Sequence, residues 1–257
     1  MWSSRSEPPF RKSRTGAPQG FFAVEATGLR WLAAAGGVAV VEPLSVGADE
    51  IVLPHVRQRP PTVADAEAFG RTLATTHRAG ARHHGCPPDG WPGDGWIATL
   101  PLPHAAAPPP GWGPFYADLR LAPFTDALDP DGRRAVEAVC ERLREGDERL
   151  TGPAEPPSRL HGDLWSGNVL WAPDGAVLVD PAADGGHRET DLAMLALFGL
   201  PHLDRVLAAY DEVHPPAEGR KDRVALHQLH PLLVHATLFG GSYVAQAVRA
   251  ARRALQL

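Results

Sequence analysis

The chain has 257 residues, with 25 lysines and arginines against 30 aspartates and glutamates, and its net charge is −5 at pH 7. This length suffices for one large domain or two small lobes with a buried core. The mild negative charge argues against a nucleic-acid-binding protein, which would need a basic face. No run of eighteen apolar residues occurs, which argues against a membrane partner. Its two cysteines match no metal-binding spacing, so we expect a reduced, cytoplasmic protein.

The first part of the chain is predicted to form a small antiparallel sheet with one helix. Apolar side chains recur at helical spacing in one stretch, which a pair of glycines ends. Three other stretches have the alternation that is typical of strands. We therefore predict strands at residues 10–14, 38–44 and 51–53, and a helix at residues 21–35.

The remainder of the chain is predicted to be mainly helical. A polar, proline-containing connector at residues 57–61 indicates a hinge, so we expect one lobe at residues 1–58 and a second at residues 59–257. Residues 85–113 are rich in Gly, Pro and Trp and are expected to form an irregular binding wall or a disordered insert. Helices are predicted at residues 63–79, 115–128, 131–150, 189–197, 203–212 and 220–255, the last broken at Pro231 or Gly240.

The most informative motif lies between residues 161 and 180. Asp163 is followed by four residues and then Asn168, and Asp180 comes one short strand later. A proton-accepting aspartate, four residues and a metal-binding asparagine is the spacing of the kinase catalytic loop. Ordinary turn residues in a hairpin would explain each of these side chains separately, but not their joint spacing. The motif therefore predicts phosphoryl transfer from a magnesium nucleotide.

The wider sequence resembles the fructosamine kinase family. Residues 161–168 read His-Gly-Asp-Leu-Trp-Ser-Gly-Asn, residues 180–182 read Asp-Pro-Ala, and residues 188–199 contain Arg-Glu-Thr-Asp-Leu-Ala-Met and Leu-Phe-Gly. That family belongs to the aminoglycoside phosphotransferase and choline kinase-like group. The resemblance implies an α+β, protein-kinase-like fold of two lobes: a small N-terminal lobe with an antiparallel sheet, and a mainly helical C-terminal lobe.

The resemblance also implies roles for individual residues, with ATP and Mg²⁺ as cofactors. Asp163 resembles the base that deprotonates the attacking hydroxyl, and Asn168 and Asp180 resemble the magnesium ligands. Lys12 resembles the lysine that contacts the nucleotide phosphates, and Glu25 the helix glutamate that pairs with it. A surface lysine and a solvated glutamate are the alternative for this last pair.

Further residues are implied to support the catalytic loop or to contact the substrate. His161 and Asp191 resemble the residues that hold the loop in place, Asp191 through backbone N–H groups. Aromatic rings stack on apolar sugar faces, although core packing would explain such residues equally well. The possible substrate wall consists of Trp112, Tyr116, His187 and Arg188.

The front of the chain departs from the family pattern. Family members normally have two strands and a glycine-rich turn before the lysine strand, which takes some fifteen or more residues. Only nine residues precede Phe10, and none is a glycine. We therefore expect an N-terminal lobe without its first hairpin, either because the true start codon lies upstream or because the phosphate lid has been lost.

The function implied by the resemblance is that of an ATP-dependent phosphotransferase with an alcohol acceptor. The acceptor would be the 3-hydroxyl of a ketosamine such as a fructosamine or ribulosamine, either a small molecule or protein-bound, in deglycation repair. We expect a monomer or weak dimer. Two alternatives stay open: an aminoglycoside- or choline-type phosphotransferase, and a pseudokinase or binding module that has lost the phosphate lid.

Two groups of histidines are weighed as metal sites. The first group is His227, His230 and His235, whose offsets of three and five residues do not place all three side chains on one helix face. The second group is His77, His83 and His84 with Cys86, and it lacks the further cysteine pair that a zinc set would need. Core or surface histidines are therefore expected in both groups.

Overall fold

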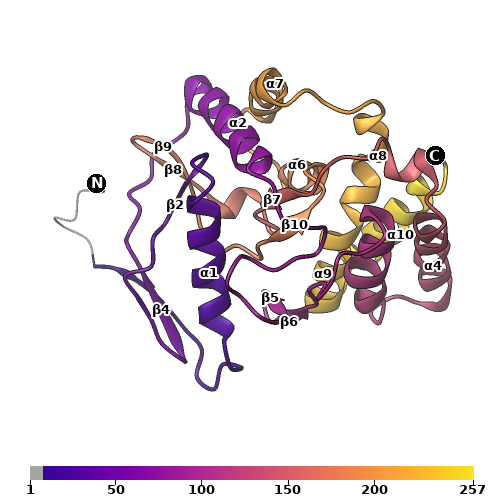
Figure 1. Cartoon of the computed structure of the whole chain (residues 1–257), viewed down its shortest axis with the longest axis horizontal. Helices are drawn as coiled ribbons and strands as arrows, with labels where there is room; N and C mark the ends of the chain where they lie inside the picture. The colour runs from indigo at the N-terminus through magenta and orange to yellow at the C-terminus, as the bar shows by residue number, and fades with distance from the viewer. Residues whose placement is uncertain (1–7) are drawn as a thin grey trace.

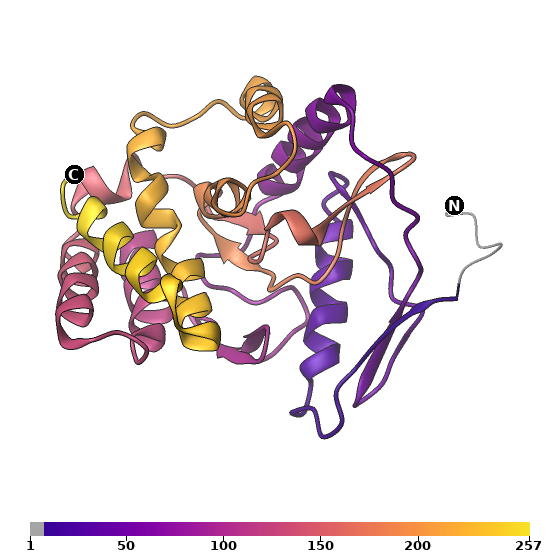
Figure 2. The ribbon, with the colours of Figure 1, turned by 180° about the vertical axis from the view of Figure 1, so that it is seen from behind.

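A computed structural model describes residues 8–257. Its first region is a three-stranded antiparallel sheet, in the order β1 (Phe10–Ser13), β4 (Glu50–Leu53) and β3 (Ser45–Val46), packed against helix α1 (Phe21–Ala33). Figure 2 shows α1 standing between this sheet and the helical remainder of the chain. The hairpin that we expected to be missing would precede Phe10, and this expectation falls almost wholly outside the described residues.

The strand predicted at residues 38–44 does not join that sheet. Only β2 (Ala39–Val40) is extended there, and it pairs in parallel with β9 (Gly175–Leu178), which pairs antiparallel with β8 (Val169–Ala172). Pro43 follows β2 and has no backbone N–H for a ladder. The prediction that residues 38–44 form a strand of that sheet is therefore wrong except at Leu44, whose N–H donates to the carbonyl of Val52 at 2.8 Å. β2 instead ties the first region to the second.

The second region is mainly helical (Figure 1). Helix α2 (Val63–Arg78) begins at a capping box formed by Thr62 and Asp65, and it packs against α7 (Leu203–Val213). Two short strands, β7 (Ser158–Leu160) and β10 (Asp184–Gly186), pair antiparallel beside it. Helix α6 (Glu189–Leu197) follows β10 directly. No helix within residues 8–257 is long and apolar enough to cross a membrane.

Two predicted helices are interrupted. The helix expected at residues 115–128 is α3 (Trp112–Phe115), a π-helical turn at Tyr116–Leu121 and a 3₁₀ turn at Ala122–Phe124, because Pro123 has no N–H for the carbonyl four residues earlier. The helix expected at residues 131–150 divides into α4 (Pro130–Arg144) and α5 (Glu148–Thr151). Gly146, with φ of 75°, ends the first of these.

The C-terminal helix is broken twice, once where predicted. It consists of α8 (Arg220–His227), α9 (Leu229–Phe239) and α10 (Ser242–Ala254). The break at Gly240 is confirmed, but the other lies at Gln228 instead of Pro231, which sits inside α9. Pro231 has no N–H for the carbonyl of His227, so the helix opens one turn before the proline. The hydroxyl of Tyr116 donates to the carbonyls of Leu226 and His227, at 3.0 and 3.3 Å.

The proline-rich stretch at residues 85–113 is ordered rather than a disordered insert. It contains a hairpin of β5 (Gly95–Ile97) and β6 (Leu100–Leu102), which lies against α1. The buried pair of Arg120 and Asp184, 2.5 Å apart, holds this segment in place, because Arg120 also donates to the carbonyl of Pro103 at 2.7 Å. The hairpin therefore forms an irregular wall beside the cleft described next.

Candidate active site

The loop after β7 turns sharply at a glycine that no other residue could replace without strain. Gly162 has φ of 80°, and a Cβ placed on it would lie 2.0 Å from the carbonyl oxygen of Ala182. The turn brings Asp163 over the segment that follows β9. Asn168 ends the loop at the start of β8, and Asp180 follows β9, so the β8–β9 hairpin positions both side chains.

Asp191 holds the start of this loop, as the family resemblance implies. From α6 its carboxylate accepts the backbone N–H groups of His161 and Gly162, at 2.8 and 3.0 Å, and lies 3.2 Å from Nε2 of His77. Burial raises the pKa of Asp191, but the hydrogen bond and charge of His77 outweigh burial and leave the pKa below its ordinary value. His161 contacts the carbonyl of Val179 at 2.9 Å and so links the loop to the strand before Asp180.

Asp163, Asn168 and Asp180 are brought together. The amide nitrogen of Asn168 donates to the backbone oxygen and the Oδ2 of Asp163, at 2.8 and 3.1 Å, and lies 3.4 Å from the carbonyl of Asp180. Burial, followed by the negative charge of Asp180, raises the pKa of Asp163 to about 7. Asp180 itself has φ of 56°, a conformation that is uncommon outside glycine and concentrates at functional sites.

The predicted contact between Lys12 and Glu25 is present, and Asp180 joins it. The Lys12 ammonium lies 2.9 Å from Oε2 of Glu25, which is 6% exposed, and it also contacts Oδ1 of Asp180. Burial lowers the pKa of Lys12, but the charges of Asp180 and Glu25 outweigh this and raise the pKa above its ordinary value. β1, α1 and the β8–β9 hairpin therefore meet at one ammonium group.

Two cavities lie on either side of this ion cluster, and Lys12, Glu25 and Asp180 line both. One has a volume of about 310 Å³ and is bounded by apolar side chains of the small sheet, of the segment between β4 and the connector, and of β8. The other has a volume of about 470 Å³ and contains Asp163. The smaller cavity is lined by Phe10, Val41, Leu53, Val56, Leu170 and Val179. The larger is lined by Arg14, Phe21, Trp96, Thr99, Asp163 and Ala183, among others.

The residues predicted as a substrate wall do not line the larger cavity. Three of them border a space of about 20 Å³ that shares Leu102 and Ala182 with the larger cavity, and all four are buried, with exposed fractions between 1% and 7%. Tyr116 and His187 lie among aromatic rings, with the Trp112 ring stacked 4.8 Å from that of Tyr116. Helical packing withdraws Trp112, Tyr116, His187 and Arg188 into the interior, and their role as a substrate wall stays a prediction.

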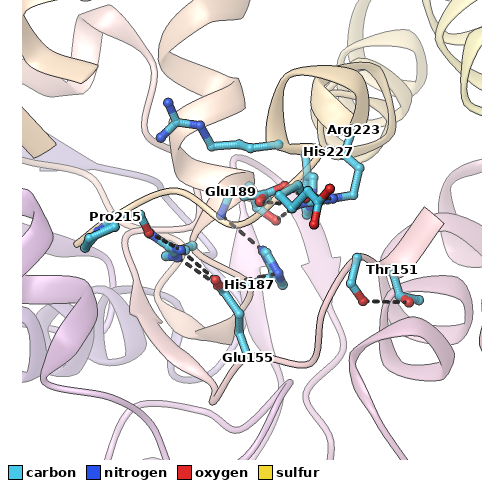
Figure 3. A network of polar contacts seen from close by, with 12 residues as sticks. Thr151, Glu155, His187, Glu189, Pro215, Arg223 and His227 are labelled. Carbon is cyan, nitrogen blue, oxygen red and sulfur yellow. Dashed lines mark hydrogen bonds and ion pairs between the residues drawn. The ribbon is translucent and has the colours of Figure 1, made fainter. Parts of the chain in front are cut away.

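Arg188 instead belongs to a buried ionic network that holds α6 in place (Figure 3). Its guanidinium donates to both oxygens of Glu155, at 2.7 and 2.5 Å, and to the carbonyl of Pro215 at 2.8 Å. One residue later, Glu189 accepts two hydrogen bonds from Arg223, at 3.0 and 2.6 Å. The Glu189–Arg223 pair joins α6 to α8, and Arg188 joins the start of α6 to Glu155, which precedes β7, and to Pro215, which follows α7. The role of both pairs is structural.

One group of side chains in this network resembles a metal site. Nitrogen or oxygen atoms of His187, Glu189 and His227 lie within 4.8 Å of one another, whereas the sequence grouped His227 with other histidines. Both oxygens of Glu189 are already bound by Arg223. A divalent cation would therefore add buried positive charge that no free acid compensates, so we assign the group to the core.

Sequence reasoning missed the side chains that line the larger cavity apart from Lys12, Glu25, Asp163 and Asp180. The hairpin residues Trp96 and Thr99 carried no signal, because a proline-rich stretch gives no periodicity. Arg14 had one: it lies two positions beyond Lys12, and side chains two apart share one face of an extended strand.

The chain is similar to known proteins over nearly its whole length. A family model described as fructosamine kinase matches residues 2–257. A relative from Thermus thermophilus, named a probable ketoamine kinase, is 34% identical over 244 residues, which cover 93% of this chain and 84% of the relative. A relative with the same type of name from Escherichia coli K12 is 31% identical over 240 residues, covering 91% and 80%.

Solved structures agree with this family and define the fold. The crystal structure of a candidate fructosamine-3-kinase from Thermobifida fusca has a TM-score of 0.87 and 48% identity, covering 97% of this chain and 86% of that one. A choline kinase from Streptococcus pneumoniae has a TM-score of 0.57 at 15% identity, covering 91% and 80%. An aminoglycoside phosphotransferase bound to gentamicin has a TM-score of 0.55 at 11% identity, covering 96% and 84%. The expected α+β, protein-kinase-like fold of this group is therefore confirmed.

Proposed function

We propose that this chain, which belongs to the fructosamine kinase family, transfers the γ-phosphate of ATP to a hydroxyl group of a ketosamine. The observation that carries the proposal is the meeting of Lys12, Glu25 and Asp180 between two cavities, with Asp163 in only the larger one. This arrangement gives the nucleotide and the acceptor separate places on either side of one cationic group. The ketosamine as acceptor is inferred from the family.

The smaller cavity suits a nucleotide base. Its apolar side chains, which include Val41 and Leu170, offer contact surfaces for a base, and residues 53–56, at the end of β4 and just after it, also border it. The ammonium of Lys12 at its inner end would bind the phosphates, with Glu25 holding the lysine in place.

The oxygen atoms at the junction of the two cavities fit a magnesium ion. Asn168 uses its amide nitrogen as the donor to Asp163, which leaves its Oδ1 free to face a cation. The Asp180 side chain is half-exposed and contacts Lys12 through one oxygen. An amide oxygen and a carboxylate are ligands that Mg²⁺ prefers, with waters and substrate phosphates completing the shell. When bound, the ion would offset negative charge on the phosphoryl group.

Asp163 is the proposed base. Its raised pKa, about 7, keeps the carboxylate ready to accept a proton near neutral pH. The acceptor hydroxyl would give its proton to Asp163 as its oxygen bonds to the γ-phosphorus, and ADP would leave with the electrons of the broken P–O bond. The products are ADP and a phosphorylated ketosamine, with the proton held on Asp163. From the family we further propose the 3-hydroxyl of a fructosamine or ribulosamine, and a role in deglycation repair.

The proposal is tested by the choice of acceptor. Release of ADP is measured with fructosamine, ribulosamine, choline and an aminoglycoside, each with Mg²⁺ and with excess EDTA. We expect magnesium-dependent turnover with a ketosamine, and a product that carries phosphate on the sugar. Turnover of choline or the aminoglycoside alone would favour the other phosphotransferase function. Failure of millimolar ATP with Mg²⁺ to shift the melting temperature would favour a binding module.

A further inference from the structure

Strand β1 sends every second side chain into the cleft. Phe10 lines the smaller cavity, Lys12 lines both, and Arg14 lines the larger one. The N–H of Arg14 donates to the carbonyl of Asp49 at 2.9 Å, so the ladder with the β3–β4 turn continues one residue past β1. The alternation of an extended strand therefore places Arg14 on the same face as Lys12, on the side of the cleft that contains Asp163.

Arg14 is a cation without an anionic partner in the part of the chain that the structure describes. Within residues 8–257 its guanidinium makes no hydrogen bond or ion pair, and its Nη1 is buried. The guanidinium lies over the ring of Phe21, 4.9 Å from the ring centre, which fixes it at the cavity edge. The neighbouring cations differ, because Arg11 pairs with Glu50 and Lys12 pairs with two acids. A buried polar atom without a partner is uncommon and calls for one.

One unpaired cation in the lining of the larger cavity supports an anionic ligand group. Lys12 pairs with Glu25 and Asp180, whereas Arg14 pairs with no acid among the described residues; the remaining acid of the lining is Asp163, the proposed base. Burial lowers the pKa of His104, which also lines this cavity, to about 4, so this side chain is neutral at pH 7. Helix α1 starts beside Arg14 with no capping side chain and no acidic residue in its first turn, which adds a positive field.

The size of the cavity sets how much of the acceptor it holds. At about 470 Å³ it has room for a sugar together with the group attached to its amine. Asp163 marks where the reacting hydroxyl would lie, so Arg14 faces a different part of the acceptor. In a ketosamine formed on the α-amino group of a free amino acid, a carboxylate lies two bonds from the amine nitrogen. In the same adduct within a peptide, that carboxylate is a neutral amide.

We propose that Arg14 binds the carboxylate of the amino-acid part of the acceptor, so that this protein prefers ketosamines of free amino acids to those on a peptide chain. The inference rests on the proposed function and names the substrate class of the same site. A guanidinium binds a carboxylate through two parallel hydrogen bonds, which gives both affinity and orientation.

The test uses two acceptors that differ only in charge: the fructose adducts of glycine and of glycinamide. The wild-type protein should turn over both, with kcat/KM about tenfold or more higher for the glycine adduct, mainly through KM. Arg14→Gln should remove this preference while leaving turnover of the glycinamide adduct and the KM for ATP unchanged. Arg14→Lys keeps the charge and should retain part of the preference. The matched control is Arg11→Gln, which should retain all of it.

Results that contradict the role of Arg14 can be told apart from results that contradict the proposed function. Equal turnover of the two adducts by the wild-type protein, or a preference that survives Arg14→Gln, would overturn the inference and leave the proposed function standing. A rise in the KM for ATP with both adducts would overturn it in favour of a phosphate contact. Absence of turnover with either adduct would instead contradict the proposed function, and the inference with it. Melting temperatures of the variants separate these effects from misfolding.

Discussion

Two carboxylates in one cleft are given different properties by their surroundings. Asp163 is partly buried, and this burial raises its pKa to about 7, whereas half of the Asp180 side chain is exposed and it contacts Lys12. We therefore propose that Asp163 accepts a proton, whereas Asp180 contacts cations. The spacing of the motif was enough to single out both residues from the sequence. Their separation into two roles was not, because it depends on burial and on a lysine 168 residues away in sequence.

Loss of the Glu25 charge tests how the Lys12 ammonium is held. Glu25→Gln keeps the shape of the side chain but removes the buried charge that pairs with Lys12 at 2.9 Å. We expect kcat/KM for ATP to fall about tenfold or more, because a charge-assisted hydrogen bond is replaced by a weaker one. Steady-state kinetics at varied ATP measures this. Glu50→Gln, at the exposed pair with Arg11, is the control and should leave ATP kinetics unchanged. An unaltered value for Glu25→Gln would contradict the proposed role.

Asp191 provides a test of stability at the same scale. Asp191→Asn replaces a carboxylate that accepts two backbone N–H groups and contacts His77. We expect a loss of about 2–3 kcal/mol in the free energy of unfolding, measured with urea. The folded-state pKa is lowered, so this contribution is present above the unfolded-state value of about 4 and is lost only as pH falls below it. The difference between wild type and variant should therefore persist from pH 8 down to pH 5; a difference that vanishes within that range would refute this account.

At the scale of elements, local sequence patterns located most helices but not the pairing of short strands. Helices α1, α2, α6 and α7 lie where apolar periodicity placed them, within two residues at each end. The pairing of β2 with β9 was missed because the two strands are far apart in the chain, and alternation specifies a strand without naming its partner. The division into lobes at residue 58 stays a prediction.

The break between α8 and α9 was misplaced for a reason that can be tested. Tyr116, from the π-helical turn, donates to the carbonyl of His227, which the proline leaves without its helical N–H partner, and to the carbonyl of Leu226. Tyr116→Phe should lower the free energy of unfolding by about 1–2 kcal/mol, because it removes a buried hydrogen bond and adds no cavity. Urea denaturation measures this, with Tyr243→Phe on the half-buried face of α10 as control. Equal stability of Tyr116→Phe and wild type would show that the hydroxyl does not support the break.

For the whole molecule, buried histidines couple folding to pH. His187 and His230 are 3% and 4% exposed, and burial lowers the pKa of each well below its ordinary value. Because their folded-state pKa is lowered, the unfolded chain binds more protons than the folded one below pH 6.5. The contribution of these two neutral histidines to the free energy of unfolding is therefore complete above that pH and is lost as pH falls.

The expected loss between pH 7 and pH 5.5 is about 1 kcal/mol for each of these histidines. Urea midpoints across that range measure the slope. His230→Asn should make the slope shallower, whereas the exposed His202→Asn should not change it. A free energy of unfolding that is flat over this range would contradict the assignment of both side chains as neutral in the folded state.

The central claim is that Asp163 accepts the proton of an acceptor hydroxyl on the cavity side opposite the nucleotide. It is tested most directly by the rate of ADP formation from ATP, Mg²⁺ and a ketosamine with Asp163→Asn. We predict a fall in kcat of about 10²–10⁴-fold, with the ATP-induced shift in melting temperature retained. Asp174→Asn, in the exposed β8–β9 turn, should keep full turnover. Turnover by Asp163→Asn at the wild-type rate would contradict the claim.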